Sequence, residues 1–169
     1  GADVPFLRPE GISGDTTPMI EVIRHFTGWL DSEKIGFDGI MLLQPTSPLR
    51  QENHIDEAVG VFEKMRPSSL VSVVEVPHNF SPGSIMEMRD SKLYESQNTQ
   101  DYLRQNKPMY YARNGPAILI MSPQAIVAGH CYAEPCAAYI MDYWSSVDVD
   151  DQDTLMMADL FLRSRIKKI

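Results

Sequence analysis

Cysteine is scarce in this sequence, and its scarcity excludes one class of fold. The 169 residues contain two cysteines, Cys131 and Cys136, which are too few for a disulfide framework. Their spacing is not that of a Cys-x-x-Cys pair, and no companion set of histidines and cysteines completes a zinc site. We therefore expect both thiols to be structural and the protein to be reduced and cytoplasmic.

Long apolar runs and excess positive charge are also missing. No stretch approaches the roughly 20 apolar residues that span a bilayer, and no basic-then-apolar signal segment opens the chain. The net charge of −8 argues against nucleic acid and anionic membranes as partners. An anionic small ligand stays compatible with this charge, because a local arginine cluster or a metal ion reverses the field around it.

The sequence does contain short apolar runs that alternate with amphipathic stretches, which is typical of an α/β domain. Apolar residues recur at helical spacing after Thr17 and after Asn53, the expected caps of two helices. Short apolar or β-branched runs predict strands at residues 40–43, 70–76, 117–121 and 137–141, and further helices are expected at 123–127 and 151–166. At this length we expect one domain, residues 1–169.

The order of these elements predicts the sheet. The segment between the first two expected strands is long enough for a crossover, so we expect a mostly parallel sheet. Such sheets bind ligands in the loops beyond the carboxyl ends of their strands. Residues 77–115 are rich in turn formers, and we expect them to form a small antiparallel excursion with extended pieces at 84–88, 92–94 and 109–112.

A polar loop from Gln44 to Arg50 follows the first expected strand. Hydrogen-bonding side chains line it, and prolines at 45 and 48 lower the entropy cost of holding it rigid. We interpret it as a ligand-binding loop, and the alternative is an ordinary polar turn.

Two acids near the end of the chain, Asp148 and Asp150, are spaced by one residue. In extended backbone both carboxylates point to one face, which is unfavourable unless a cation lies between them. Oxygen ligands of this kind suit Mg²⁺. The alternative is an acidic run that caps the final helix, although Asp151 and Asp153 are better candidates for that cap.

Arginines are the remaining candidates for ligand contacts. Arg104 and Arg113 precede Asn114 and Gly115, and a guanidinium offers a planar fork to carboxylate or phosphate. Arg8 has the same character, and each could instead be a surface arginine. The four histidines are scattered, and no nucleophilic triad stands out.

With these residues in view, the chain resembles the acylneuraminate cytidylyltransferases, the CMP-sialic acid synthetase family. The resemblance runs from Arg8 to the end of the chain. The residues that carry it are Arg8-Pro9-Glu10, Asp15-Thr16, Leu42 to Arg50, Ser69 to Val73, Arg104, Arg113-Asn114-Gly115, Tyr139-Ile140-Met141 and the run from Ser146 to Asp150.

This resemblance implies a Rossmann-like nucleotidyltransferase fold, a three-layer sandwich, and a homodimer built partly through residues 77–115. The implied reaction joins CTP and a nine-carbon 2-keto sugar acid into a CMP-sugar and pyrophosphate. Arg8 and Thr17 would lie near the nucleotide. The sugar acid would be met by Gln44, Arg104, Asn114 and Tyr132, and Asp148 and Asp150 would hold Mg²⁺.

The resemblance also implies a preceding strand and a Gly/Arg/Lys-rich phosphate loop, and we expect this chain to start after both. Turnover by the 169 residues alone is therefore expected to be impaired. The alternative is a non-catalytic binding or dimerisation module that kept the fold.

Overall fold

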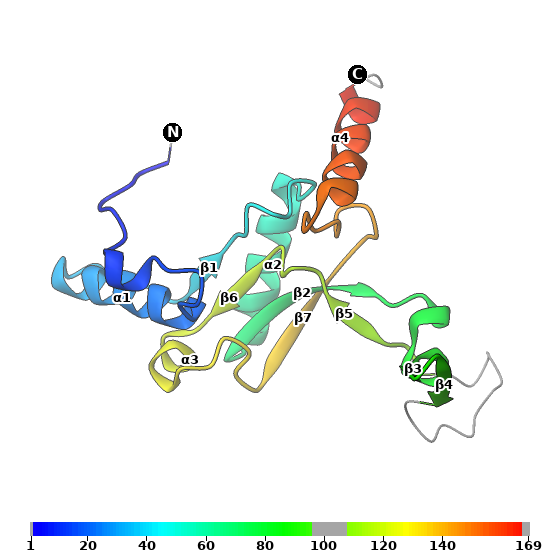
Figure 1. Cartoon of the computed structure of the whole chain (residues 1–169). Helices are drawn as coiled ribbons and strands as arrows, with labels where there is room; N and C mark the ends of the chain where they lie inside the picture. Colours follow the sequence, from blue (N-terminus) through cyan, green and yellow to red (C-terminus); the bar gives the residue numbers. More distant parts are fainter. Residues whose placement is uncertain (1, 96–107, 167–169) are drawn as a thin grey trace.

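The computed structural model describes residues 2–95 and 108–166, and its centre is a five-stranded sheet (Figure 1). Its strands are short, and apolar side chains occupy the positions that face the core. The strands are β1 (Ile40–Leu42), β2 (Ser69–Glu75), β5 (Tyr111–Arg113), β6 (Leu119–Met121) and β7 (Cys136–Met141). The class of the fold is therefore mixed α/β, as predicted.

The prediction of a mostly parallel sheet was wrong. β6 lies between β1 and β2 and is antiparallel to both, β5 is also antiparallel to β2, and only β7 pairs with β2 in parallel. β1 and β2 do run in the same direction, as the crossover between them requires. They cannot pair with each other, because a strand from much later in the chain separates them.

β5 and β6 lie on the same edge of β2 and form one interrupted strand. β6 pairs with Ser69 to Val71, β5 pairs with Val73 to Glu75, and β7 runs along the opposite edge of β2 over both stretches. Uninterrupted pairing from β6 would bring residue 117 opposite Val73, but Arg113 stands there instead. Four extra residues are therefore looped out between the two parts of the strand.

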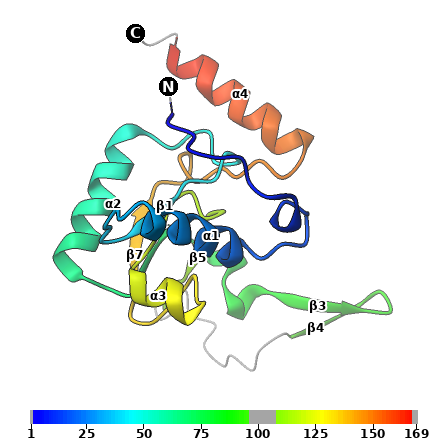
Figure 2. The same cartoon turned by 90° about the vertical axis from the view of Figure 1, so that its left-hand side faces the viewer.

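Helices cover both faces of the sheet (Figure 2). α1 (Met19–Ser32) and α3 (Pro123–Ala128) pack on one face, and α2 (Glu52–Met65) packs on the other. α4 (Gln152–Ile166) projects from the body at the C-terminal end (Figure 1). Three short 3₁₀ turns complete the helical structure: Glu10–Ile12, His78–Phe80 and Pro82–Ser84.

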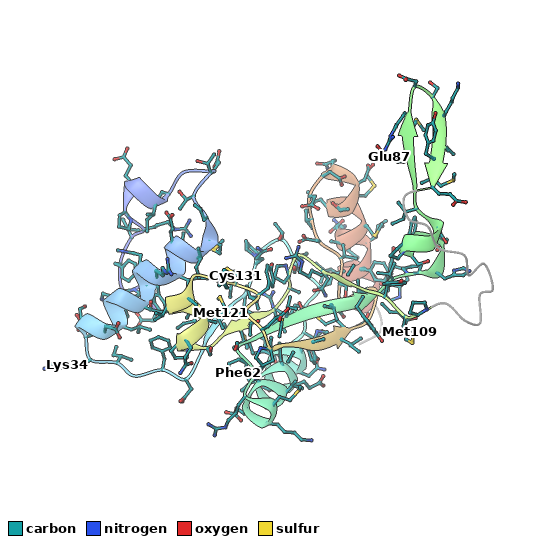
Figure 3. All side chains as sticks on the ribbon, turned by 90° about the horizontal axis from the view of Figure 1, so that it is seen from below. Lys34, Phe62, Glu87, Met109, Met121 and Cys131 are labelled. Atoms are coloured by element: carbon teal, nitrogen blue, oxygen red, sulfur yellow. The ribbon has the colours of Figure 1, made fainter. Side chains whose placement is uncertain are left out.

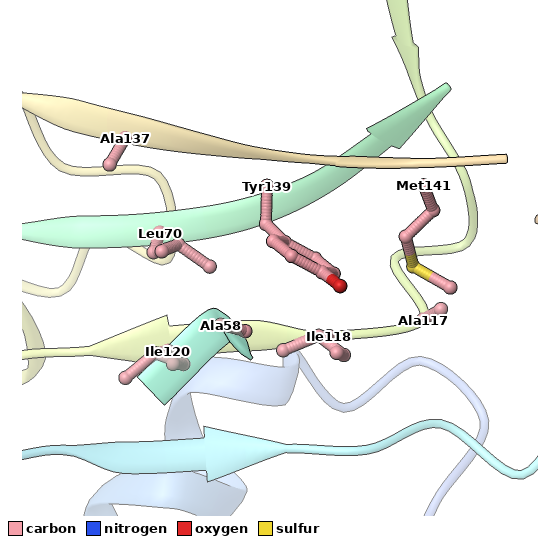
Figure 4. Packing of buried hydrophobic residues seen from close by; sticks show 8 residues of the cluster. All are labelled: Ala58, Leu70, Ala117, Ile118, Ile120, Ala137, Tyr139 and Met141. Carbon is pink, nitrogen blue, oxygen red and sulfur yellow. The ribbon is translucent and has the colours of Figure 1, made fainter. Parts of the chain in front are cut away.

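Each face of the sheet has its own apolar core. Figure 4 shows the core beneath α2, where Tyr139, Leu70 and Ile118 pack around Ala58 of the helix. The core beneath α1 and α3 contains Met121, and Figure 3 shows it near Cys131, with Phe62 of α2 on the other side of the sheet. Because neighbouring residues of a strand point to opposite faces, β2 and β6 contribute side chains to both cores.

The two predicted helix caps were wrong. α1 begins at Met19 with Pro18 as its N-cap, so Thr17 lies one residue too early to cap it. The N-cap of α2 is Gln51 rather than Asn53. The Gln51 side chain bonds the backbone at His54, and the His54 ring accepts a hydrogen bond from the Gln51 N–H. The predicted cap of α4 is confirmed, since Asp151 Oδ1 accepts a hydrogen bond from the Thr154 N–H at 2.8 Å.

The antiparallel excursion is present as a hairpin. β3 (Met86–Arg89) pairs with β4 (Lys92–Glu95), and every residue of both strands is exposed. Figure 3 shows this hairpin, marked by Glu87, extending away from the sheet. The third expected piece, at 109–112, overlaps β5 and joins the main sheet instead. Within residues 2–95 and 108–166, no helix is long and apolar enough to cross a membrane.

Arg24 of α1 fastens α3 to α1, and Gly129 leaves room for its guanidinium, which gives a test of this packing. Gly129 ends α3 with a φ of +84°, and a Cβ built on it would lie 2.8 Å from Arg24 Nη2. The same guanidinium donates hydrogen bonds to the carbonyls of Ile126 and Val127 at 3.0 and 2.6 Å.

We expect Gly129→Ala to lower the free energy of unfolding by about 1–2 kcal/mol, since it combines left-handed strain with a steric conflict. Urea denaturation measures the change. The control is Gly28→Ala in α1, where no atom lies within 4 Å of an added Cβ, and it should be neutral or stabilising. Equal stability of the two variants would show that Gly129 has no such role.

Candidate active site

Three segments that are distant in sequence meet beyond the ends of β1 and β7. They are the loop at residues 44–50, the looped-out residues 114–117, and the acidic segment at residues 146–150. The Val149 N–H donates a hydrogen bond to the Thr46 carbonyl at 2.8 Å, which joins the acidic segment to the loop. The polar loop and the acidic run therefore lie side by side, although about a hundred residues separate them in the sequence.

Arg50 holds the 44–50 loop against the sheet. Its Nη1 donates to the carbonyl of Gln44 at 3.3 Å and to the carbonyl of Ala117 at 2.7 Å. Partial burial lowers the pKa of the Arg50 guanidinium. Leu49 is buried beside Val147 and Ala158, so the loop is also anchored by apolar contact with the base of α4.

Asn114 fixes the looped-out residues through its side-chain amide. Its Oδ1 accepts hydrogen bonds from the Ser72 hydroxyl at 2.6 Å and from the Ala117 N–H at 3.4 Å. Its Nδ2 donates to Ser146 Oγ at 2.9 Å and to the Met141 sulfur at 3.4 Å. Since the side chain is 4% exposed and bonds internally at both ends, its geometry suits shaping the site rather than reaching into it.

A tight turn after β7 directs the acidic segment. Asp142 Oδ1 accepts hydrogen bonds from the N–H groups of Trp144 and Ser145 at 2.9 and 3.0 Å. Burial opposes ionisation of the Asp142 carboxyl, but the hydrogen bonds from Ser145 and Trp144 outweigh it and lower its pKa. Ser146 Oγ donates to the Asp142 carbonyl at 2.7 Å, so this turn is also tied to Asn114.

Gly115 brings Asp148 close to the 44–50 loop. A Cβ built on Gly115 would lie 3.1 Å from both Asp148 Oδ2 and Ser47 Oγ. Among the described residues, the buried side-chain nitrogen and oxygen atoms without a hydrogen-bond partner are Ser47 Oγ and Asp148 Oδ1. A buried carboxylate oxygen without a partner is costly, and an external donor or a cation would remove that cost.

These residues fit a divalent cation in part. The donor set is oxygen only, as Mg²⁺ prefers, and one carboxylate oxygen is buried and unsatisfied. Asp150 is exposed, and its N–H donates to Thr154 Oγ1 at 3.1 Å. Because Asp151 caps α4, neither Asp148 nor Asp150 is needed for that cap. In the part of the chain that the structure describes, no group of three or more His, Cys, Asp or Glu residues gathers.

Arg8 and Gln44 border one groove, with a volume of about 510 Å³. The groove runs along β1 between α1 and residues 3–8, and Phe6 holds that segment on α1 with its ring 5.5 Å from Trp29. Thr17 lies two residues before Met19, which also lines the groove. Of the predicted nucleotide and sugar residues, the structure thus brings Arg8 and Gln44 together.

Tyr132 contacts Arg113, the residue directly before the looped-out segment, and the sequence did not indicate this contact. The Arg113 guanidinium stacks over its ring at 4.4 Å, a cation–π distance. Both side chains are exposed. Arg104, the remaining predicted substrate residue, lies outside the described residues.

Sequence reasoning missed two features of this site. The sequence indicated only that Ser47 belongs to a polar loop, and it did not indicate that Gly115 lies close to Asp148. The left-handed φ of +112° at Gly115 was indicated by the glycine itself, but its closeness to Asp148 depends on tertiary structure.

The sequence of this chain is similar to those of several named bacterial proteins. The chain is 32% identical over 154 residues to the N-acylneuraminate cytidylyltransferase of Escherichia coli, covering 90% of this chain and 35% of that protein. It is 30% identical over 153 residues to the CMP-N,N'-diacetyllegionaminic acid synthase of Legionella pneumophila, covering 89% of this chain and 65% of that protein. No protein-family profile matches the chain.

A third relative, the post-translational flagellin modification protein B of Campylobacter coli, is 24% identical over 98% of this chain and 70% of its own length. The chain thus spans about a third of the first relative and about two thirds of the other two. By name, the first relative is a cytidylyltransferase and the second is the synthase of a CMP-linked acid. Over about 90% of its length, this chain is similar to proteins of the CMP-sialic acid synthetase-like family.

Gly115 offers a test of how closely the three segments pack. We expect Gly115→Ala to lower the free energy of unfolding by about 1–3 kcal/mol, because φ is left-handed and the new methyl group meets Asp148 and Ser47. Urea denaturation reports the change. Gly36→Ala is the control, since an added Cβ there meets nothing within 4 Å. A Gly115→Ala variant as stable as its control would contradict the close approach.

Proposed function

We propose that this chain carries the catalytic core of a cytidylyltransferase that activates a nine-carbon 2-keto sugar acid with CTP. The observation that carries the proposal is the meeting of Asp148 with the 44–50 loop at Gly115, where two buried oxygens lack partners. The names of the first two relatives, a cytidylyltransferase and the synthase of a CMP-linked acid, support this choice of nucleotide and sugar class.

The proposed reaction is a nucleophilic displacement at the α-phosphorus of CTP. The anomeric hydroxyl oxygen of the sugar acid bonds to the α-phosphorus of CTP, and the bond from that phosphorus to the β-phosphate oxygen breaks. Pyrophosphate leaves, and the hydroxyl proton passes to water. Asp148 and Asp150 would hold Mg²⁺, which supplies charge neutralisation at the phosphates when bound. The protein's own contribution is positioning, from segments fixed by Arg50 and Asn114.

The remaining predicted contacts divide between two regions. Arg8 and Gln44 border the groove along β1, where Arg8 and Thr17 would meet the nucleotide and Gln44 the sugar acid. Tyr132, held by Arg113, would form a wall of the sugar pocket. Asn114 would shape this pocket from within, and Arg104 would meet the sugar carboxylate.

The proposal extends to fold and assembly. Helices on both faces of the sheet support a three-layer, Rossmann-like nucleotidyltransferase domain over residues 1–169. We propose a homodimer formed partly through residues 77–115, which include the exposed β3–β4 hairpin with Met88 70% and Leu93 56% exposed. We place the reaction in the cytoplasm.

A first prediction concerns the 169 residues alone. Within the described residues β1 pairs with β6 only, and the chain covers 35% and 65% of the first two relatives. We expect weak or no CTP-dependent pyrophosphate release from these residues with any of several nine-carbon sugar acids. Adding a Gly/Arg/Lys-rich phosphate-binding segment on the N-terminal side should raise the rate. Rapid turnover by the 169 residues would contradict the need for a further phosphate-binding segment.

A second prediction concerns the acids. In the active polypeptide, Asp148→Asn and Asp150→Asn should each reduce pyrophosphate release about 100-fold or more, because they remove charge that holds the cation at the reacting phosphates. Asp31→Asn on α1 is the control and should keep full activity. Undiminished rates in both site variants would exclude the metal role. Absence of turnover in every form tested would favour the alternative, a non-catalytic binding module.

A further inference from the structure

We propose that Ser47 is a positioning residue of the Asp148 cation site, where its hydroxyl oxygen accepts a hydrogen bond from a water molecule bound to the cation. This inference rests on the proposed function, because it needs Asp148 to hold a divalent cation. It adds a residue to that site and a chemical role for its side chain.

The first observation is that Ser47 differs from the other fully buried serines. Ser69 Oγ donates to the Ala133 carbonyl at 2.8 Å, and Ser72 Oγ donates to Asn114 at 2.6 Å. Ser145 Oγ accepts a hydrogen bond from Gln51 at 3.3 Å. Ser47 is 1% exposed, yet its hydroxyl has no partner in the described residues. A serine that served packing alone would bond to a neighbouring carbonyl or be replaced by alanine without loss.

The second observation is where the hydroxyl points. Ser47 Oγ and Asp148 Oδ2 both lie 3.1 Å from the point where a Cβ on Gly115 would stand, and the other Asp148 oxygen is the second unpartnered buried atom. The two side chains therefore both lie against Gly115, whose lack of a Cβ permits their approach. They do not bond to each other. A ligand that occupied a position next to both unpartnered oxygens would satisfy both of them.

The third step is the chemistry of that occupant. The charge of Asp148 disfavours an isolated anion and favours a cation. A hydroxyl oxygen next to that carboxylate suits a hard cation that keeps part of its water shell, as Mg²⁺ does. Groups that hold the waters and ligands of a metal commonly change its affinity by about 10–100-fold when they are removed.

The backbone around Ser47 is suited to this role. Its N–H donates to the Gln44 carbonyl at 3.4 Å, and its carbonyl accepts from the Arg50 N–H at 3.5 Å. The bonds of Arg50 to Gln44 and Ala117 then hold the turn against the sheet. The hydroxyl is therefore presented by a rigid turn rather than by a free loop.

The test measures Mn²⁺ binding to the full 169-residue chain, by electron paramagnetic resonance of free Mn²⁺, together with melting temperatures without metal. We expect Ser47→Ala to weaken Mn²⁺ binding about 10-fold and to leave the metal-free melting temperature equal or higher, since an unsatisfied hydroxyl is removed. Ser47→Cys keeps the buried volume but offers a poor acceptor, so it should weaken binding similarly.

The matched control is Ser69→Ala, which removes a buried hydroxyl that has a partner. It should lower the melting temperature and leave Mn²⁺ affinity unchanged. Wild-type affinity in both Ser47 variants would overturn the inference, as would a loss of CTP affinity without any loss of Mn²⁺ affinity. If the unsubstituted chain bound no Mn²⁺, or if Asp148→Asn bound it normally, the metal role in the proposed function would fail as well.

Discussion

The hydrogen bonds of the Asn114 side chain are the constraint on which the rest of the site depends. One buried amide joins Ser72 in the middle of the sheet, the backbone at Ala117 where β6 begins, and Ser146 in the segment that leads to the acids. These bonds hold three segments in fixed positions relative to one another: the loop that interrupts the strand, the end of β7 and the acidic run. The loop at 44–50 is held in the same arrangement by Arg50, which donates a hydrogen bond to the Ala117 carbonyl. Four segments are thereby fixed relative to one another by two side chains.

The polar groups of this region are satisfied with few exceptions, and the exceptions lie together. Asp142, Ser146, Asn114 and Arg50 each make side-chain hydrogen bonds within the protein. Ser47 and Asp148 each keep a buried oxygen without a partner. Folded proteins rarely leave such atoms unpaired, because each costs free energy. Their juxtaposition at Gly115 distinguishes them from the side chains that hold the segments together, and it is the basis of the proposed ligand contact.

Much of this arrangement could be predicted from the sequence, because local patterns carry it. Helical spacing of apolar residues identified α1 and α2, β-branched composition identified β2, and Asp151 was recognised as the cap of α4. The order of strands could not be predicted in this way, since the apolar pattern of β6 does not say which neighbours it pairs with. The caps at Thr17 and Asn53 were misplaced because Pro18 keeps an extended ψ of 135° and because a histidine supplies the capping contact to Gln51. The unpaired hydroxyl of Ser47 is a property of the packed molecule, and no sequence pattern reports it.

The interruption between β5 and β6 has a consequence for how this region can vary in length. Val71 and Val73 point to one face of β2, so their partners Leu119 and Arg113 lie on the same face although the pairing is broken between them. Each part of the interrupted strand is aligned by its own pairing with β2, and the looped-out residues belong to neither ladder. A length change in that loop can therefore be absorbed locally, whereas a single insertion within β5 or β6 would turn the side chains beyond it to the opposite face of the sheet.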